Sequence, residues 1–559
     1  MLAPVLFPAK KPSPAPQPAP TPEQLRKACS RQLGTSRLRL PLCAVLSVLL
    51  LALLVYQEYR LNWIPFLSNS RTVGTLSVVL WALCVLLAYN VLVKGFEQLF
   101  RLQIGLETLC AISTVLVAID AVTALKTAQL PYCAVSALGL TFALWGLSDG
   151  YLGKLHTLRM VQSAEEPKAI EQIPAAWNDK SGLFRSECNL SNFMHQLQQP
   201  DLTSKAMRIY SPIVLLLSLA ISIYLSVTGK LPFVRAWMIL LLGSTPLCGF
   251  LSYTRPFALL AKRLTKCGGA ICGWAGSKIF SGRHILVLRD ADVFPSGSIS
   301  MNGVKLYGGY SMERVISYAA AVTAACESTL APIFERYRAE QNCRRYSVGM
   351  YRYYEVGGVG AEVLDDVVLI GSLRFMNSMG VHMDAGMNVK QAVYLSINGE
   401  LACVFAMKYK PSASVGSGLS AIARNTHLNA VLATRDFLIT PDYLRYKYNV
   451  PADSFVYPSV KERLRLSEQD LSGQGTQGAL LLKDNFSAFA HTVCGGRSLR
   501  TCVRIGTVVD LMAGAVGLIL MLLLLFLDAI ATASAFNLTL FLLVWTLPGL
   551  LLSRSTRRV

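Results

Sequence analysis

The chain has 559 residues, 53% of them hydrophobic, and a mean hydropathy of +0.43. That value is too apolar for a soluble enzyme and indicates a protein that crosses a membrane several times. The formal net charge is +20, but the basic residues form no stripe interleaved with aromatic residues. The charge therefore does not predict a nucleic-acid partner.

Residues 1–40 precede the apolar part of the chain. The run from Pro8 to Pro22 is rich in proline, alanine and lysine, a composition that favours extended conformations and cannot build a core. We therefore predict a disordered tail over residues 1–40.

Eight apolar stretches approach the length of about 20 residues that a membrane-spanning helix needs. They lie at 41–56, 75–94, 105–125, 131–150, 209–229, 233–254, 507–530 and 535–553. Basic residues gather in the N-terminal tail and at the C-terminus, where Arg554, Arg557 and Arg558 lie. With an even number of spans, the positive-inside rule places both termini in the cytoplasm. The prediction is a multi-pass protein of the plasma membrane, surrounded by the lipid bilayer.

Two polar segments interrupt the spans, at 151–208 and at 255–506. In the second, strands alternate with helical stretches, which predicts an α/β unit. The expected strands are 284–289, 366–370, 392–397, 402–407 and 429–434, and the expected helices are 311–341, 414–425 and 459–469. We predict two subdomains, one made of 255–300 with 408–506 and the other of 301–407. Strands 284–289 and 429–434 would then be neighbours.

The first of these strands leads directly into Asp290-Ala291-Asp292. An aspartate at the tip of an apolar strand is how haloacid-dehalogenase-type domains present the nucleophile for phosphoryl transfer. Two carboxylates at this spacing can also divide the roles of nucleophile and general acid–base, as in phosphatases. A structural alternative is that Arg289 pairs with either aspartate.

The order of spans and inserted segments, together with local matches, resembles the P-type ATPases, specifically their heavy-metal-transporting subgroup. The resemblance implies an α-helical membrane bundle of eight spans with an inserted cytoplasmic α/β haloacid-dehalogenase-like domain. That domain would carry a second, nucleotide-binding-like α/β subdomain, and the loop 151–208 would be a truncated actuator. ATP and Mg²⁺ are the implied cofactors, and a metal cation the implied cargo.

Individual residues carry this resemblance. Asp290 matches the phosphorylated aspartate of D-K-T-G-T, although the rest of that motif is lost. Ala433-Thr434-Arg435-Asp436 resembles L-T-G-D-N, and Lys461 in Pro458-Ser459-Val460-Lys461 resembles the lysine of P-x-x-K. Cys326-Glu327-Ser328-Thr329-Leu330-Ala331 resembles S-E-H-P-L-A, and Gly358-Val359-Gly360 the Gly-x-Gly turn near the nucleotide. The implied catalytic residues are Asp290, Asp292, Thr434, Asp436 and Lys461, and the implied nucleotide-binding residues are Glu327, Gly358 and Gly360.

The departures from the family are concentrated in the catalytic motifs. The sixth span has Thr245-Pro246-Leu247 in place of Cys-Pro-Cys, so Cys248 and Asp510 are only weak candidates for metal ligands. Asp510 is expected near enough to the cytoplasmic end to be solvated. The G-D-G-x-N-D motif that holds Mg²⁺ is missing after Lys461, with Asp484 as the only substitute, and 151–208 lacks the Thr-Gly-Glu of an actuator.

These losses belong to one transport cycle and favour a pseudo-pump with a regulatory or structural role, in which the use of ATP and Mg²⁺ is doubtful. Three alternatives stay open. One is a divergent but active cation-transporting ATPase, and another is a membrane-tethered Asp-x-Asp phosphatase. The third is a receptor or scaffold without phosphate chemistry. The sequence identifies no protein partner.

Overall fold

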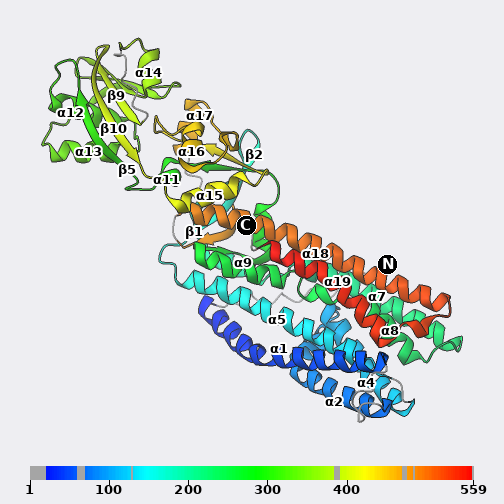
Figure 1. The fold of residues 1–559 in the computed structure, drawn as a ribbon. Coiled ribbons are helices and arrows are strands. Elements are labelled where there is room, and N and C mark those ends of the chain that lie inside the picture. The colour runs from blue at the N-terminus through cyan, green and yellow to red at the C-terminus, as the bar shows by residue number, and fades with distance from the viewer. Residues whose placement is uncertain are drawn as a thin grey trace, which may run out of the picture.

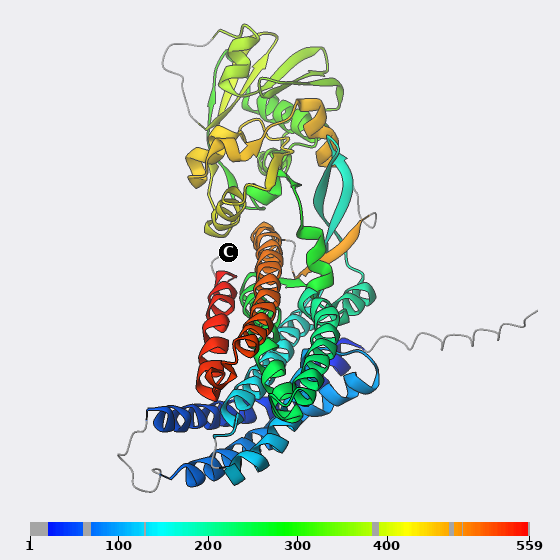
Figure 2. The ribbon, with the colours of Figure 1, turned by 90° about the vertical axis from the view of Figure 1, so that its right-hand side faces the viewer.

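The computed structural model describes residues 21–59, 69–127, 130–382, 391–468, 475–482 and 485–556. It contains a long helical bundle with an α/β head at one end (Figure 1). A view turned by 90° shows the head above the bundle, with the start of the long helix α18 (Phe486–Phe526) directly beneath it (Figure 2). The predicted fold class, a helical membrane bundle with an inserted α/β unit, is confirmed.

The helices of the bundle come from three parts of the chain, separated by the segments 168–187 and 269–481 that belong to the head. They are α1 (Pro22–Glu58), α2 (Ser70–Leu87), α3 (Tyr89–Phe100), α4 (Leu106–Thr127), α5 (Cys133–Gln162), α6 (Leu190–Gln198), α7 (Leu202–Val227), α8 (Phe233–Ser244), η2 (Leu247–Phe250), α9 (Thr254–Cys267), α18 (Phe486–Phe526), η5 (Ile530–Thr532) and α19 (Ala535–Ser555). Seven helices of the described chain are long and apolar enough to cross a membrane. An eighth span results when α8 and the helical segment Leu247–Cys267 count as one broken span, bent by 59°.

The break in this span lies at Pro246, between the end of α8 and the start of η2. Proline has no backbone N–H and disfavours a helical conformation in the residue before it. Thr245 accordingly has an extended backbone, with φ −88° and ψ 108°. Pro246 thus accounts for the bend in this span.

Two sequence predictions for the first helices are wrong. The tail predicted to be disordered is helical from Pro22 onward, because Thr21 and Gln24 form a capping box and Cys29 and Leu33 are buried. The span predicted at 75–94 is divided, since α2 ends at Leu87 and α3 begins at Tyr89. Residues 1–20 lie outside the described chain.

The head is built on two sheets. Its strands are β1 (Lys168–Trp177), β2 (Lys180–Glu187), β3 (Gly269–Ile271), β4 (His284–Leu288), β5 (Ile299–Leu306), β6 (Val348–Tyr354), β7 (Gly358–Val363), β8 (Asp366–Gly371), β9 (Ala392–Ile397), β10 (Glu400–Tyr409), β11 (Leu428–Leu432), β12 (Phe455–Val456) and β13 (Thr476–Leu481). Its helices are α10 (Gly273–Ser277), η3 (Lys278–Phe280), α11 (Asp290–Val293), α12 (Met312–Ala325), α13 (Ala331–Glu340), α14 (Leu373–Ser378), α15 (Ala413–Ala423), α16 (Pro441–Tyr448), η4 (Ala452–Ser454) and α17 (Val460–Glu468).

The core lobe is the part of the head built on the seven-stranded sheet, whose order is β12-β11-β4-β2-β1-β13-β3. Strand β4 runs parallel to β11, with Leu286 opposite Ala430, as the sequence predicts for these neighbours. On its other side β4 runs parallel to β2, with Leu183 opposite Leu286. Strand β2 comes from the loop 151–208. The hairpin β1–β2 is therefore an integral part of the core lobe.

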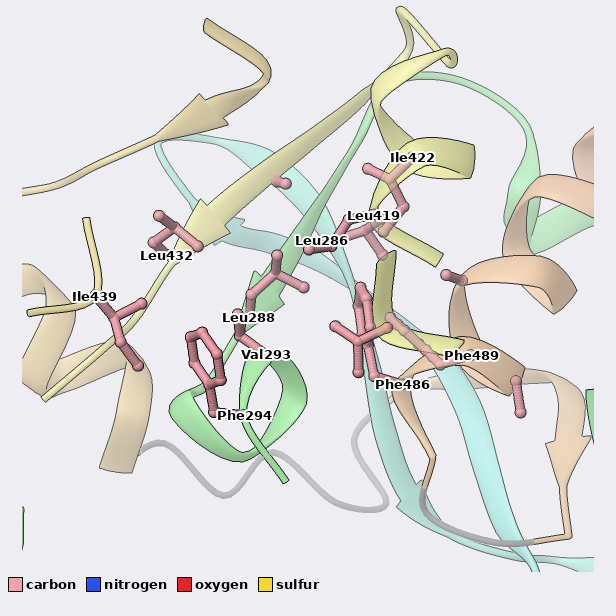
Figure 3. Close-up of a cluster of buried hydrophobic side chains, with 14 of the residues drawn as sticks. Leu286, Leu288, Val293, Phe294, Leu419, Ile422, Leu432, Ile439, Phe486 and Phe489 are labelled. Atoms are coloured by element: carbon pink, nitrogen blue, oxygen red, sulfur yellow. The ribbon is translucent and has the colours of Figure 1, made fainter. Parts of the chain in front are cut away.

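Helices α15 and α18 cover one face of this sheet. Leu286 and Leu288 of β4 point toward Leu419, Ile422, Phe486 and Phe489, which come from α15 and the first turn of α18 (Figure 3). Ile285 and Val287 pack on the opposite face with residues of the hairpin, including Trp177 and Phe184. Helix α18 continues from this core into the bundle without a break over 41 residues, a length of about 60 Å. The head and the bundle thus share one rigid element.

The inserted lobe is the six-stranded antiparallel sheet β5-β10-β9-β8-β7-β6 with its helices. The single helix predicted at 311–341 consists of two, α12 and α13, because the chain turns at Glu327, which has a positive φ of 48°. The predicted strands 366–370, 392–397 and 402–407 correspond to β8, β9 and β10.

Candidate phosphoryl-transfer site

Asp290 lies at the carboxyl end of β4, at the start of α11. The segment after β11 runs alongside it, since Ala433 N–H donates to the Leu288 carbonyl at 2.8 Å and Arg435 N–H donates to Asp290 Oδ2 at 2.9 Å. Asp290 Oδ1 is buried and makes no hydrogen bond within the described residues. Parallel pairing of β4 with β11 therefore brings Asp290, Thr434 and Asp436 to one edge of the sheet.

The pKa values of the two buried carboxyl groups at this edge, Asp290 and Asp436, are both raised. Burial, and then the charge of Asp436, raises the pKa of Asp290 to about 7. Burial also raises the pKa of Asp436 to about 6, although Tyr409 Oη donates to its Oδ2 at 2.6 Å and Leu438 N–H to its Oδ1 at 2.9 Å. A large fraction of Asp290 is therefore protonated at neutral pH.

The two remaining polar candidates of this lobe differ in their surroundings. Thr434 is buried, and its Oγ1 donates to the Ile439 carbonyl at 3.3 Å. Lys461 is exposed on α17. The buried cation of α17 is Arg463, which stacks at 4.1 Å on the Tyr457 ring and donates to its hydroxyl. The sequence analysis missed Arg463, although Val460, Arg463 and Leu466 form the buried face of α17.

Asp292 is 3% exposed and is held by two donors. Arg185 of β2 forms an ion pair with its Oδ1, and Arg289 N–H donates to its Oδ2 at 2.8 Å. Arg289 thus contacts Asp292 through its backbone. The sequence analysis did not identify Arg185, because nothing in the local pattern places β2 beside β4. Each oxygen of Asp292 thus accepts from a donor within the fold, which fixes its side chain between β2 and the start of α11.

Arg435 joins the core lobe to the inserted lobe. Its guanidinium contacts Glu327 of the inserted lobe at 2.5 Å, Glu468 at 3.0 Å and Ser467 Oγ at 2.9 Å. A second contact between the lobes is made by Glu355, which accepts the N–H of Val460 at 2.9 Å. These contacts leave an interlobe cavity of about 20 Å³, bounded by Gly358, Thr434 and Arg435 among others. That volume suits about one water molecule, whereas nucleotide-sized ligands need several hundred Å³.

The glycines of the predicted nucleotide turn lie in strand β7 and are explained by packing. A Cβ at Gly358 would lie 2.1 Å from the Phe375 ring, and one at Gly360 would lie 3.1 Å from Leu369. Phe375 is fully buried against this strand. The absence of side chains at these positions therefore accommodates Phe375 and Leu369.

A magnesium ion takes about six oxygen ligands and relies on carboxylates. Asp292 and Asp436 have both oxygens engaged by donors, and Asp290 keeps only Oδ1. The described chain contains no group of three or more His, Cys, Asp or Glu residues that could hold a metal ion. These residues do not fit Mg²⁺, and the predicted substitute Asp484 lies outside the described residues.

The two weak metal candidates of the bundle lie near each other. Cys248 and Asp510 both line a cavity of about 10 Å³ beside Pro246. Asp510 is only 1% exposed, so the expectation that it is solvated is wrong; α18 extends the helix toward the head and buries this position. Cys248 Sγ lies 3.8 Å from the Thr546 carbonyl. Two side chains do not make a metal site.

Comparisons with known proteins found similarity only among solved structures. No protein-family model matches the chain, and no curated protein matches it. Among solved structures, a zinc-transporting PIB-type ATPase in the E2.Pi state aligns with 93% of this chain and 99% of its own, at 11% identity and a TM-score of 0.45. The N-domain of HMA8, a copper-transporting P-type ATPase, aligns with 19% of this chain and 98% of its own, at 22% identity and a TM-score of 0.18. These values are too low to assign an activity or a cargo.

Proposed function

We propose that this protein is a P-type-ATPase-like membrane protein whose head no longer turns over ATP, a pseudo-pump with a regulatory or structural role. The observation that supports this most strongly is the strand beside β4. Strand β2 occupies that position and delivers Arg185, which neutralises Asp292 at the edge where the metal ion of a phosphoryl-transfer site would need carboxylates.

Phosphoryl transfer depends on positioning and on charge neutralisation by Mg²⁺ and cations. Here the nucleophile candidate Asp290 shares a buried site with Asp436, and burial favours its protonated, non-nucleophilic form. Loss of the metal ligands and of an ionised nucleophile removes contributions of several kcal/mol each to transition-state stabilisation, by order of magnitude.

The hairpin β1–β2 supports the same conclusion for the hydrolysis step. Its strands are hydrogen-bonded to β4 on one side and to β13 on the other. The loop 151–208 could move as a separate domain only if these ladders broke. An actuator that directs water onto a phosphoaspartate is therefore not expected from this loop.

The active cation-transporting ATPase remains the second candidate, because Asp290, Thr434 and Asp436 do converge on one sheet edge and Asp290 keeps one free oxygen. The Asp-x-Asp phosphatase is less favoured, since Arg185 and the Arg289 backbone hold Asp292.

Nucleotide binding by the full-length protein in detergent, measured by calorimetry with ATP with and without Mg²⁺, tests the proposal. The isolated segment 262–500 is unsuitable because it lacks β1 and β2 from the middle of the sheet. We expect no Mg²⁺-dependent binding by the wild type. Arg435→Ala, which opens the interlobe cavity and releases Glu327, should gain weak binding that does not depend on Mg²⁺. Arg465→Ala, an exposed arginine of α17, is the control. Mg²⁺-dependent binding by the wild type would overturn the proposal.

A further inference from the structure

A cavity of about 720 Å³ lies where the head meets the bundle, between α15, α18 and the end of α19. Figure 1 shows α15 next to α18, with the C-terminal end of the chain beside them. This cavity is separate from the sheet edge that carries Asp290. Three arginines line it, Arg263, Arg424 and Arg497, and its described lining contains no carboxylate.

Uncharged hydrogen-bonding groups complete the wall between these arginines. The hydroxyl-bearing residues Ser420, Ser498 and Thr501 line the cavity. His491 also lines it, with Nε2 at 3.1 Å from Ser417 Oγ, whereas its buried Nδ1 makes no hydrogen bond within the described residues. Arg497 Nη1 donates to the Gly282 carbonyl at 2.6 Å, which fixes the guanidinium. Cations and hydroxyl donors, in a lining whose described residues include no carboxylate, are the recognition chemistry of a phosphate group.

The position of the cavity relative to the membrane indicates the source of that phosphate. Ile505 and Leu552 form part of its wall. On the same two helices, Val508 is 55% exposed and Leu551 is 63% exposed, at the start and end of apolar stretches that cross the membrane. A ligand whose phosphate lies among the arginines would therefore continue directly into hydrocarbon surroundings. A free phosphate or a soluble phosphate ester would leave this apolar side unused.

We propose that this cavity binds the phosphate-bearing headgroup of an anionic membrane phospholipid, with the acyl chains lying along α18 and α19. Basic pockets beside membrane helices on the cytoplasmic side of a membrane are suited to such headgroups. The bound lipid joins α15 of the head to α18 and α19 of the bundle. Because it binds the folded state only, it stabilises the junction between the two.

Native mass spectrometry of the full-length protein in detergent, with phosphatidic acid or a phosphatidylinositol phosphate added against phosphatidylcholine, tests this site. The double variant Arg424→Gln/Arg497→Gln should weaken binding of the anionic lipid at least tenfold. Thr501→Trp fills the cavity without changing its charge and should weaken binding to a similar degree, which covers the case that the double variant does not fold. Arg504→Gln/Arg554→Gln removes two exposed arginines of the same helices outside the cavity and should leave binding unchanged.

Each other outcome overturns the assignment. An equal loss in the cavity variants and the control double variant would mean attraction by general surface charge. If millimolar inorganic phosphate or inositol phosphate displaces the lipid and binds as tightly as the lipid does, the site recognises a soluble anion. Equal binding of phosphatidylcholine would mean that the arginines do not recognise the phosphate charge.

Discussion

Replacing Asp290 with asparagine should change how the stability of the protein depends on pH. The folded protein holds a proton on Asp290 up to about pH 7, whereas an unfolded aspartate releases it near 3.8. Between these values the folded state binds more protons than the unfolded state, so the free energy of unfolding decreases as the pH rises through this window. Asparagine is never charged and removes this dependence.

The size of the effect follows from the same values. A pKa raised from 3.8 to about 7 corresponds to about 4 kcal/mol of destabilisation once Asp290 is fully ionised. By pH 5 the wild type has already lost about 1.6 kcal/mol of this stability. Asp290→Asn should therefore unfold at a slightly higher temperature than the wild type at pH 5, and the difference should widen to several degrees by pH 8. Thermal unfolding of the detergent-solubilised protein, followed by intrinsic fluorescence from pH 5 to pH 8, measures this difference.

Asp453→Asn provides the control, because Asp453 is exposed on the same lobe and should show no such difference. Parallel curves for the wild type and Asp290→Asn across the whole range would refute the reasoning. They would mean that Asp290 is already ionised in the folded protein, as a working nucleophile requires.

Three other substitutions probe the contacts of the head. Arg185→Gln leaves the buried carboxylate of Asp292 without this ion pair and should lower the free energy of unfolding by about 3–5 kcal/mol. In a double-mutant cycle measured by thermal unfolding, Arg185→Gln/Asp292→Asn should recover part of this loss. Additive effects of the two substitutions would contradict the pairing. Gly358→Ala places a Cβ 2.1 Å from Phe375 and should lower the free energy of unfolding by about 1–3 kcal/mol. Adding Phe375→Leu should restore stability. If it does not, packing against Phe375 does not explain the glycine, and a role in a nucleotide-binding turn becomes the better explanation. Glu355→Ala removes the acceptor of the Val460 N–H and should speed limited proteolysis between the lobes, while an unchanged digestion rate would show that Glu355 does not hold them together.

Much of the architecture could be predicted from local sequence patterns. The spans, the strand before Asp290 and its pairing with the strand before Thr434 follow from apolar periodicity and from the discontinuous α/β pattern. The convergence of Asp290, Thr434 and Asp436 follows in turn, because parallel strands end at the same edge. The break at Pro246 was predictable because proline cannot continue the hydrogen-bond ladder.

The contacts that close the site could not be predicted in the same way. Strand β2 pairs with β4 across more than a hundred positions, as the contact between Ser181 and His284 shows, and such long-range pairing leaves no local signal. Arg435 was recognised only as a replacement for glycine, because its partners Glu327 and Glu468 lie on different elements. Arg463 could have been identified from the three-residue spacing of the buried positions on α17.

The most direct test of the pseudo-pump is phosphorylation of the full-length protein by radiolabelled ATP with Mg²⁺, followed by acid quenching. The wild type should carry no more label than Asp290→Asn, because Arg185 occupies the edge that would need a metal ion and burial keeps a large fraction of Asp290 protonated at neutral pH. Acid-stable label that requires Mg²⁺ and disappears in Asp290→Asn would contradict this account and favour an active pump.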